Sequence, residues 1–291
     1  MRYGVNFPHA IGKDPVAIRD WAQAVEGNGF DYMLTIDHVA GVHRDQFGPD
    51  GPAFNYTSET PTHELLTLFA FVAGVTTRLE LAPSVLLLPQ RPTVLAAKQC
   101  AEVQILSGGR LRVVVGIGWN HVEYASLGAN FHNRGRRLEE QIEVMKALWT
   151  AERVDYNGRY HKLAGINLNP LPDKAPPLWM GGGADDKLLR RYAKYADGWL
   201  PLVVPGSDVP AAVERLRGFL AEEGRDPASF GLDVRVNIEN ATPEEWVASA
   251  KRWRDLGATN IAIMGAPGDR TPMENLARFG EALQVIKAEV G

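Results

Sequence analysis

The stretch that decides the fold is residues 111–118, which read LRVVVGIG. Apolar residues follow one another here without the polar alternation of a half-exposed strand. Such a near-continuous run is typical of a parallel strand with both faces covered. Glycines close the run, and a glycine at a strand end lets a ligand approach the backbone closely. The run predicts a buried strand whose carboxyl end faces a ligand.

Similar apolar runs lie on both sides of this one. The eight expected strands are residues 3–7, 32–36, 79–88, 111–116, 178–180, 198–202, 232–238 and 261–264. Amphipathic stretches follow them, for example residues 15–28, 92–107, 185–195, 243–256 and 272–289. Eight strand–helix units predict an α/β fold with a single (β/α)8 TIM barrel over residues 1–291. A doubly wound sheet stays open as the alternative, since alternation alone does not separate the two.

Two connections are longer than simple loops. Residues 38–61 follow the second expected strand and are rich in glycine, proline and aromatic residues, as in a lid or a substrate wall. Residues 121–176 form an insertion region between the fourth and fifth strands. Within it we expect a helix at residues 136–150 and a tight hairpin at residues 154–160, because Asn157-Gly158 is a strong turn signal.

Composition excludes several classes of protein. The 31 basic and 35 acidic residues leave a net charge of −4, so no bulk basic footprint for nucleic acid exists. Cys100 is the single cysteine, which excludes a disulfide framework, and the histidines lack metal-ligand spacing. No apolar run approaches the roughly 20 residues of a membrane span, and no secretory signal is visible. We expect a cytoplasmic enzyme with a small-molecule substrate and no nucleic-acid, membrane or metal partner.

Asp37 and His38 end the second expected strand, which is the catalytic end in a barrel. A histidine there can donate or accept a proton near neutral pH. The alternative for His38 is a structural hydrogen-bonding role.

Two glycine segments follow strands. Gly116-Ile117-Gly118 lacks the third glycine of a dinucleotide fingerprint, because position 121 is His121. Met180-Gly181-Gly182-Gly183 precedes a helix, so its backbone N–H groups can cradle an anion or phosphate. The alternative is a flexible turn with Asp185 as the helix N-cap.

Together these motifs resemble the luciferase-like monooxygenase superfamily, and more closely its branch that uses the deazaflavin coenzyme F420. The motifs that carry the resemblance are Gly29-Phe30-Asp31, Asp37-His38, residues 84–89, residues 106–111, residues 116–120, Glu123-Tyr124, residues 134–140, residues 177–182 and Asp197-Gly198-Trp199.

The resemblance implies a barrel with an insertion, a homodimer, and a flavin-type ring in the barrel mouth. It places Asp37 and His38 beside the ring, with His38 as the proton donor or orienting group. It also implies a non-proline cis peptide at Ser84-Val85. The cofactor-binding positions that it implies are Asp37, Ser84, Val85, Gly118, Trp119, Asn120, Met180, Gly181, Gly182 and Gly183.

Three functional hypotheses follow from the resemblance. The first is an F420-dependent oxidoreductase that transfers hydride to or from a small organic substrate. The alternative is an FMN-dependent monooxygenase, and the third is a flavin-binding barrel without catalysis. Members acting on sugar phosphates carry a Glu shortly after the fourth strand, where this chain has Trp119-Asn120-His121. That difference disfavours sugar-phosphate dehydrogenation.

Overall fold

The computed structural model describes residues 1–47, 56–202, 207–265 and 270–291. Over these ranges, nine strands form one parallel sheet in the order β3-β2-β1-β11-β10-β9-β8-β5-β4. They are β1 Arg2–Asn6, β2 Tyr32–Thr35, β3 Glu80–Pro83, β4 Leu86–Leu87, β5 Val113–Gly116, β8 Leu178–Gly182, β9 Gly198–Pro201, β10 Gly231–Asn237 and β11 Asn260–Met264. A parallel bridge between Leu81 of β3 and Leu111, which lies just before β5, closes the sheet on itself. This closure confirms the predicted barrel.

The third expected strand, residues 79–88, is wrong as a continuous element. A cis peptide between Ser84 and Val85 interrupts it, as the resemblance implied. β3 pairs with β2, and β4 pairs with β5 on the other side. This one stretch of chain therefore contributes both edges of the sheet. If each strand position around the barrel is called a stave, β3 and β4 together form the third of eight staves.

Val85 projects into the barrel at this break. A Cβ atom built on Gly116 of β5 would lie 2.2 Å from Val85 Cγ2, and one on Gly181 of β8 would lie 2.3 Å from Val85 Cγ1. Real Cβ atoms essentially never show such short contacts, so a larger residue at either position would force Val85 or the strands to shift. The space beside these two glycines is therefore taken by the valine side chain.

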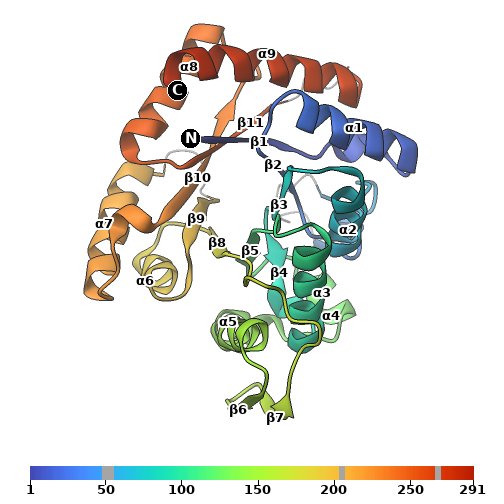
Figure 1. Ribbon diagram of the computed structural model, residues 1–291, viewed down its shortest axis with the longest axis vertical. Helices are drawn as coiled ribbons and strands as arrows, with labels where there is room; N and C mark the ends of the chain where they lie inside the picture. Colours follow the sequence, from blue (N-terminus) through green and yellow to red (C-terminus); the bar gives the residue numbers. More distant parts are fainter. Residues whose placement is uncertain (48–55, 203–206, 266–269) are drawn as a thin grey trace.

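The helices are α1 Pro15–Gly27, α2 Leu65–Val75, α3 Thr93–Leu106, α4 His121–Ser126, α5 Arg134–Thr150, α6 Asp186–Tyr195, α7 Val209–Glu222, α8 Pro243–Leu256 and α9 Pro272–Val290. The longer ones surround the strands, with α9 packed against α1 and α8 (Figure 1). Thr242 and Thr271 begin α8 and α9 with capping boxes, each followed by a proline that suits the first helical turn. Within the described ranges, no helix has the length and apolar character needed to cross a membrane.

The insertion between β5 and β8 contains α4, α5 and the antiparallel strands β6 Val154–Asn157 and β7 Lys162–Ile166. The hairpin lies beyond α5, at the end of the molecule opposite α9 (Figure 1). The expected helix begins two residues early, at Arg134. The turn is also longer than an Asn-Gly turn, because Glu140 of α5 accepts hydrogen bonds from the N–H groups of Arg159 and Tyr160 and holds them in place.

A polar layer fills the barrel near the amino ends of the strands. The guanidinium of Arg112 lies 4.7 Å from the ring centroid of Tyr32 and 4.6 Å from that of Trp179. Gly198 and Gly231 make room for the Trp179 ring, since a Cβ on either would come within 2.4 Å of it. The barrel is therefore a packed core at this end. Residues 48–55 of the expected wall at 38–61 lie outside the described residues.

The contact between Val85 and Gly181 makes a stability prediction. Gly181→Ala is expected to lower the free energy of unfolding by about 1–3 kcal/mol, because the new methyl group overpacks against Val85. Val85→Ala in the same chain should recover part of this loss, as measured by urea unfolding. Gly218→Ala in α7, whose Cβ would meet nothing within 4 Å, is the control and should be neutral or stabilising. An equal loss from Gly181→Ala with and without Val85 would contradict the overpacking account.

Candidate active site

A cavity of about 700 Å³ opens at the carboxyl ends of the barrel strands, which is where barrel enzymes bind their substrates. Its volume suits a ligand with an organic ring system. The apolar lining includes Phe7, Leu34, Val85, Leu87, Ile117, Leu202 and Met264. The polar lining includes Asn6, His9, His38, Tyr56, Ser84 and Arg235.

The structure brings eight of the eleven predicted site residues to this cavity: Asp37, His38, Ser84, Val85, Gly118, Trp119, Gly181 and Gly182. The other three lie elsewhere. Asn120 is buried and caps α4 by accepting a hydrogen bond from the Glu123 N–H at 3.1 Å. Met180 is buried in the hydrophobic core, and the Gly183 carbonyl accepts a hydrogen bond from the Tyr192 hydroxyl. Cofactor contact stays a prediction for all of these positions.

His38 is held by a carboxylate that the sequence did not single out as a site residue. Its Nδ1 lies 3.0 Å from Oε2 of Glu123, whose side chain is fully buried. The other oxygen of Glu123 accepts hydrogen bonds from the N–H groups of Val39 and Ala40. Burial alone would raise the pKa of Glu123, but the hydrogen bonds from His38 and these amides bring it below its ordinary value.

This pairing fixes the chemistry of the imidazole. Glu123 is an acceptor, so Nδ1 of His38 carries a proton, and Nε2 is the nitrogen left for a ligand in the cavity. The carboxylate also stabilises the imidazolium that forms when Nε2 takes up a proton, as in other carboxylate–histidine pairs. Glu123 lies on α4 in the insertion, far from His38 in the sequence. Its presence in a matched motif, Glu123-Tyr124, was the one available signal.

Asp37 has a different environment from His38. Its Oδ1 lies 2.7 Å from Nη2 of Arg91, and its Oδ2 accepts a hydrogen bond from the Leu87 N–H at 2.9 Å. Burial would lower the pKa of Arg91, but Asp37 and Glu64 raise it, so this guanidinium stays charged. Asp37 therefore positions β4 and the turn after it. Its carboxylate is committed to Arg91, and a catalytic role for it stays a prediction.

Aromatic rings and a second histidine complete the wall around His38. The ring centroids of Tyr56 and Trp119 lie 5.5 and 6.1 Å from that of His38. The ring centroid of His9 lies 5.9 Å from that of Tyr56, and burial lowers the pKa of His9. His9 was not among the predicted site residues, and its place just after the first strand was the one signal for it.

The glycine segment before α6 has the helix N-cap that was named as the alternative to a phosphate cradle. Asp185 caps the helix, and its carboxylate accepts a hydrogen bond from the Leu188 N–H at 3.0 Å. The Gly182 carbonyl accepts a hydrogen bond from the Trp199 indole. A carboxylate thus already stands at this helix N-terminus. Phosphate binding at Gly181, Gly182 and Gly183 stays a prediction.

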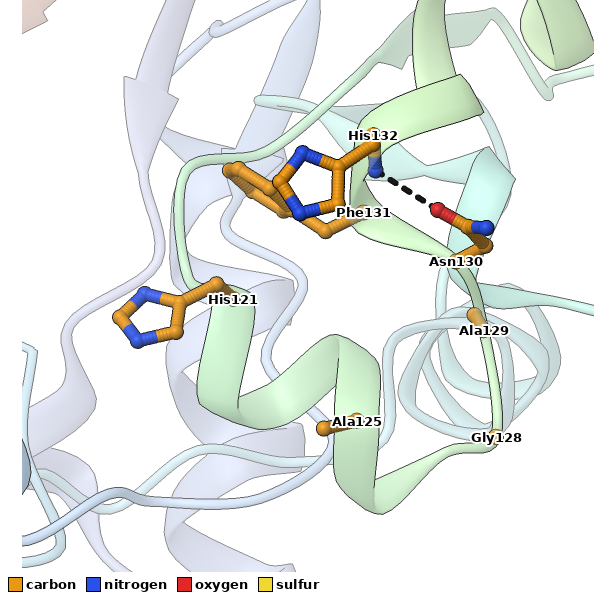
Figure 2. A pocket seen from close by; sticks show the side chains of 7 residues that line it. All are labelled: His121, Ala125, Gly128, Ala129, Asn130, Phe131 and His132. Carbon is orange, nitrogen blue, oxygen red and sulfur yellow. Dashed lines mark hydrogen bonds between the residues drawn. The ribbon is translucent and has the colours of Figure 1, made fainter.

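A second, more open hollow of about 560 Å³ lies beside the first, between α4 and the short 3-10 helix η4 Phe131–Asn133. Figure 2 shows its lining, with His121 at the start of α4 and Phe131 and His132 on η4. The Phe47 ring lies 6.0 Å from His121 and 5.5 Å from Trp119, and so connects the two walls. This hollow has no carboxylate or guanidinium in its lining. The cavity at His38 is the better candidate for chemistry.

Comparisons with known proteins point to one protein family. A model of the luciferase-like monooxygenase family matches residues 1–273. An uncharacterized protein of Mycobacterium tuberculosis is 33% identical over 293 residues, which cover 97% of both chains. An F420-dependent glucose-6-phosphate dehydrogenase of Nocardia farcinica is 30% identical over 233 residues, covering 73% of this chain and 68% of that one.

Among solved structures, a long-chain alkane monooxygenase superposes with a TM-score of 0.81 at 13% identity, over 99% of this chain and 91% of the other. This likeness shows the shared fold. The match of the family model over nearly the whole chain shows the family as well. The chain belongs to the luciferase-like monooxygenase family.

Proposed function

We propose that this protein is an F420-dependent oxidoreductase that transfers hydride to or from a small organic substrate in the 700 Å³ cavity. The observation that carries the proposal is His38, held at Nδ1 by buried Glu123 and facing a cavity with an apolar floor. A proton-transfer group beside an apolar platform suits a reaction in which hydride and proton move separately.

The residues of the cavity fit a deazaflavin or flavin ring. Val85, Leu87 and Ile117 offer apolar surface for one face of a flat ring, and Gly118 has no side chain to obstruct it. Gly118 has φ +67°, a conformation that glycine adopts readily. When bound, a deazaflavin supplies a two-electron hydride donor or acceptor.

The protein's own residues then control the proton. His38 donates a proton from Nε2 when the substrate is reduced and accepts one when the substrate is oxidised. Glu123 stabilises the charged imidazole and keeps the ring from rotating. Tyr56 and Trp119, packed around His38, limit the access of water to this nitrogen.

The choice of F420 is supported by the relative named for its F420 dependence. The second candidate is an FMN-dependent monooxygenase, which the fold shared with an alkane monooxygenase favours. We do not extend the proposal to sugar phosphates. In this chain Asn120 stands in the segment after the fourth stave, buried and occupied in capping α4.

The cofactor is tested by titrating the purified protein with F420 and with FMN while following tryptophan fluorescence, since Trp119 lines the cavity. We expect saturable F420 binding that excess FMN does not displace. Tight FMN binding without F420 affinity would establish the second candidate instead.

His38 is tested by substitution in the loaded enzyme. With a substrate identified from a panel of alcohols and carbonyl compounds, His38→Ala is expected to lower kcat by about 10²–10⁴-fold, the usual contribution of a general acid–base group. Cofactor affinity should be unchanged. His132→Ala in the second hollow is the control, and unchanged turnover in His38→Ala would remove this residue from the mechanism.

The Glu123–His38 pair makes a prediction about pH. Burial would raise the pKa of Glu123, but the hydrogen bond from His38 helps to hold it below its ordinary value, so His38→Ala is expected to raise the pKa of Glu123. The measurement is an NMR pH titration of the carboxyl carbon of Glu123. His161→Ala is the matched control, because it removes the histidine that Glu140 holds at 2.8 Å outside the cavity, and it should leave the pKa of Glu123 unchanged. An unchanged pKa of Glu123 in His38→Ala would contradict the pairing.

A further inference from the structure

Arg235 is a cation in the cavity that the proton-transfer mechanism does not use. It lies on β10, where successive side chains point to opposite faces. Asp233 and Arg235 face the barrel interior, while Val234 and Val236 belong to the hydrophobic core outside it. The Arg235 side chain lines the cavity and is 20% exposed.

Arg235 is the last member of a chain of ion pairs inside the barrel. Arg2 pairs with Glu80 at the amino ends of the strands, and Glu80 accepts a hydrogen bond from Nε of Arg112 at 2.8 Å. Arg112 in turn lies 2.8 Å from Oδ2 of Asp233, and Asp233 lies 3.2 Å from Nη1 of Arg235. Three cations thus share two carboxylates, with a cation at each end.

The shared carboxylate does not neutralise Arg235. Asp233 also accepts a hydrogen bond from the Tyr32 hydroxyl at 2.8 Å, on the same oxygen that faces Arg235. Arg112 is only 2% exposed, and its buried positive charge is balanced by the carboxylates of Asp233 and Glu80. The excess positive charge therefore lies at the two ends. One end is the exposed Arg2, and the other is the cavity.

The second charged group of the lining has its own partner. Asp37 is paired with Arg91, which also contacts Glu64 at 2.9 Å. An anion beside Arg235 would therefore be recognised locally, by the donors of this guanidinium, rather than by the net charge of the lining.

Ser84 gives the cation a defined geometry. Its Oγ accepts a hydrogen bond from Nη2 of Arg235 at 3.2 Å, and the Ser84 N–H donates to the Thr35 carbonyl at 2.7 Å. Within the described part of the chain, Arg235 donates to Asp233 and Ser84 only, which uses two of the five N–H donors of a guanidinium. The remaining donors and the Ser84 hydroxyl proton can serve a ligand.

We propose that Arg235 and Ser84 form an anion-binding subsite in the lining of the cavity, which takes a delocalised oxygen anion. The anion could come from two sources, and both of them rest on the proposed function. One is a carboxylate on the substrate, and the other is the anionic ring of the reduced cofactor.

The first arm of the test uses the purified full chain without cofactor and the probe pair benzoate and benzamide, which differ mainly in charge. Titration by calorimetry is expected to show benzoate binding at least tenfold more tightly than benzamide. Arg235→Gln should remove this preference and leave benzamide affinity unchanged. Arg235→Lys, which keeps the charge and loses the planar fork, should give an intermediate preference.

Arg2→Gln is the matched control, because it removes the same charge from the other end of the same ion-pair chain. It should leave the benzoate preference unchanged. Thermal unfolding of each variant confirms that the barrel is intact.

The second arm uses the protein loaded with whichever of F420 or FMN it binds, and measures the reduction potential of the bound cofactor and benzoate affinity. If the subsite holds the reduced ring, Arg235→Gln makes the potential more negative, by about 30 mV for each tenfold loss of two-electron stabilisation. Benzoate is then excluded. If the subsite holds a substrate carboxylate, benzoate still binds the loaded protein and the potential is unchanged.

Either result supports the subsite and identifies its source. The proposal is overturned if Arg235→Gln alters neither the benzoate affinity nor the potential of the bound cofactor. It is overturned in the same way if the wild-type protein binds benzoate and benzamide alike, or binds neither, and Arg235→Gln leaves the potential unchanged. Failure of the proposed function would look different, because a protein that binds neither cofactor would still show the benzoate preference in the first arm.

Discussion

The packing of Val85 between β5 and β8 is the contact on which the site depends. The chain breaks its third stave at Ser84-Val85, and the valine fills the space that Gly116 and Gly181 leave open. This side chain forms part of the apolar lining of the cavity. The hydroxyl of the neighbouring Ser84 lies next to Arg235.

Two neighbouring residues with similar sequence signals perform different physical tasks. Asp37 is buried against Arg91 and the Leu87 amide, so it holds β4 beside β2. His38 turns toward the cavity and takes its orientation from Glu123. The difference arises from their partners, since the Asp37 carboxylate meets a guanidinium and the His38 imidazole meets a carboxylate.

Sequence patterns predicted much of the fold for a definite reason. Parallel strands covered on both faces need continuous apolar runs, and such runs mark residues 111–116 and 232–238 plainly. The break at residues 84–85 had no signal of its own and came only from family resemblance. In the site, His38 and Gly181 were found because they follow or end strands, and Val85 was found through the family resemblance. Glu123 and Arg235 were missed, because a buried carboxylate on an insertion helix and an inward-facing arginine look like ordinary surface residues in a sequence.

The sequence by itself determined an α/β fold of strand–helix units with candidate site residues at the strand ends, because strand and helix periodicities are local properties. It also placed the insertion at residues 121–176. It left a barrel and a doubly wound sheet both open, and the closure of the sheet decided between them. Tertiary structure alone decided which distant charges meet. The pairs of His38 with Glu123 and of Arg235 with Asp233 and Ser84 form only after barrel closure brings different staves together. The proposed function rests on those pairings, because a buried charge takes its properties from its neighbours in space.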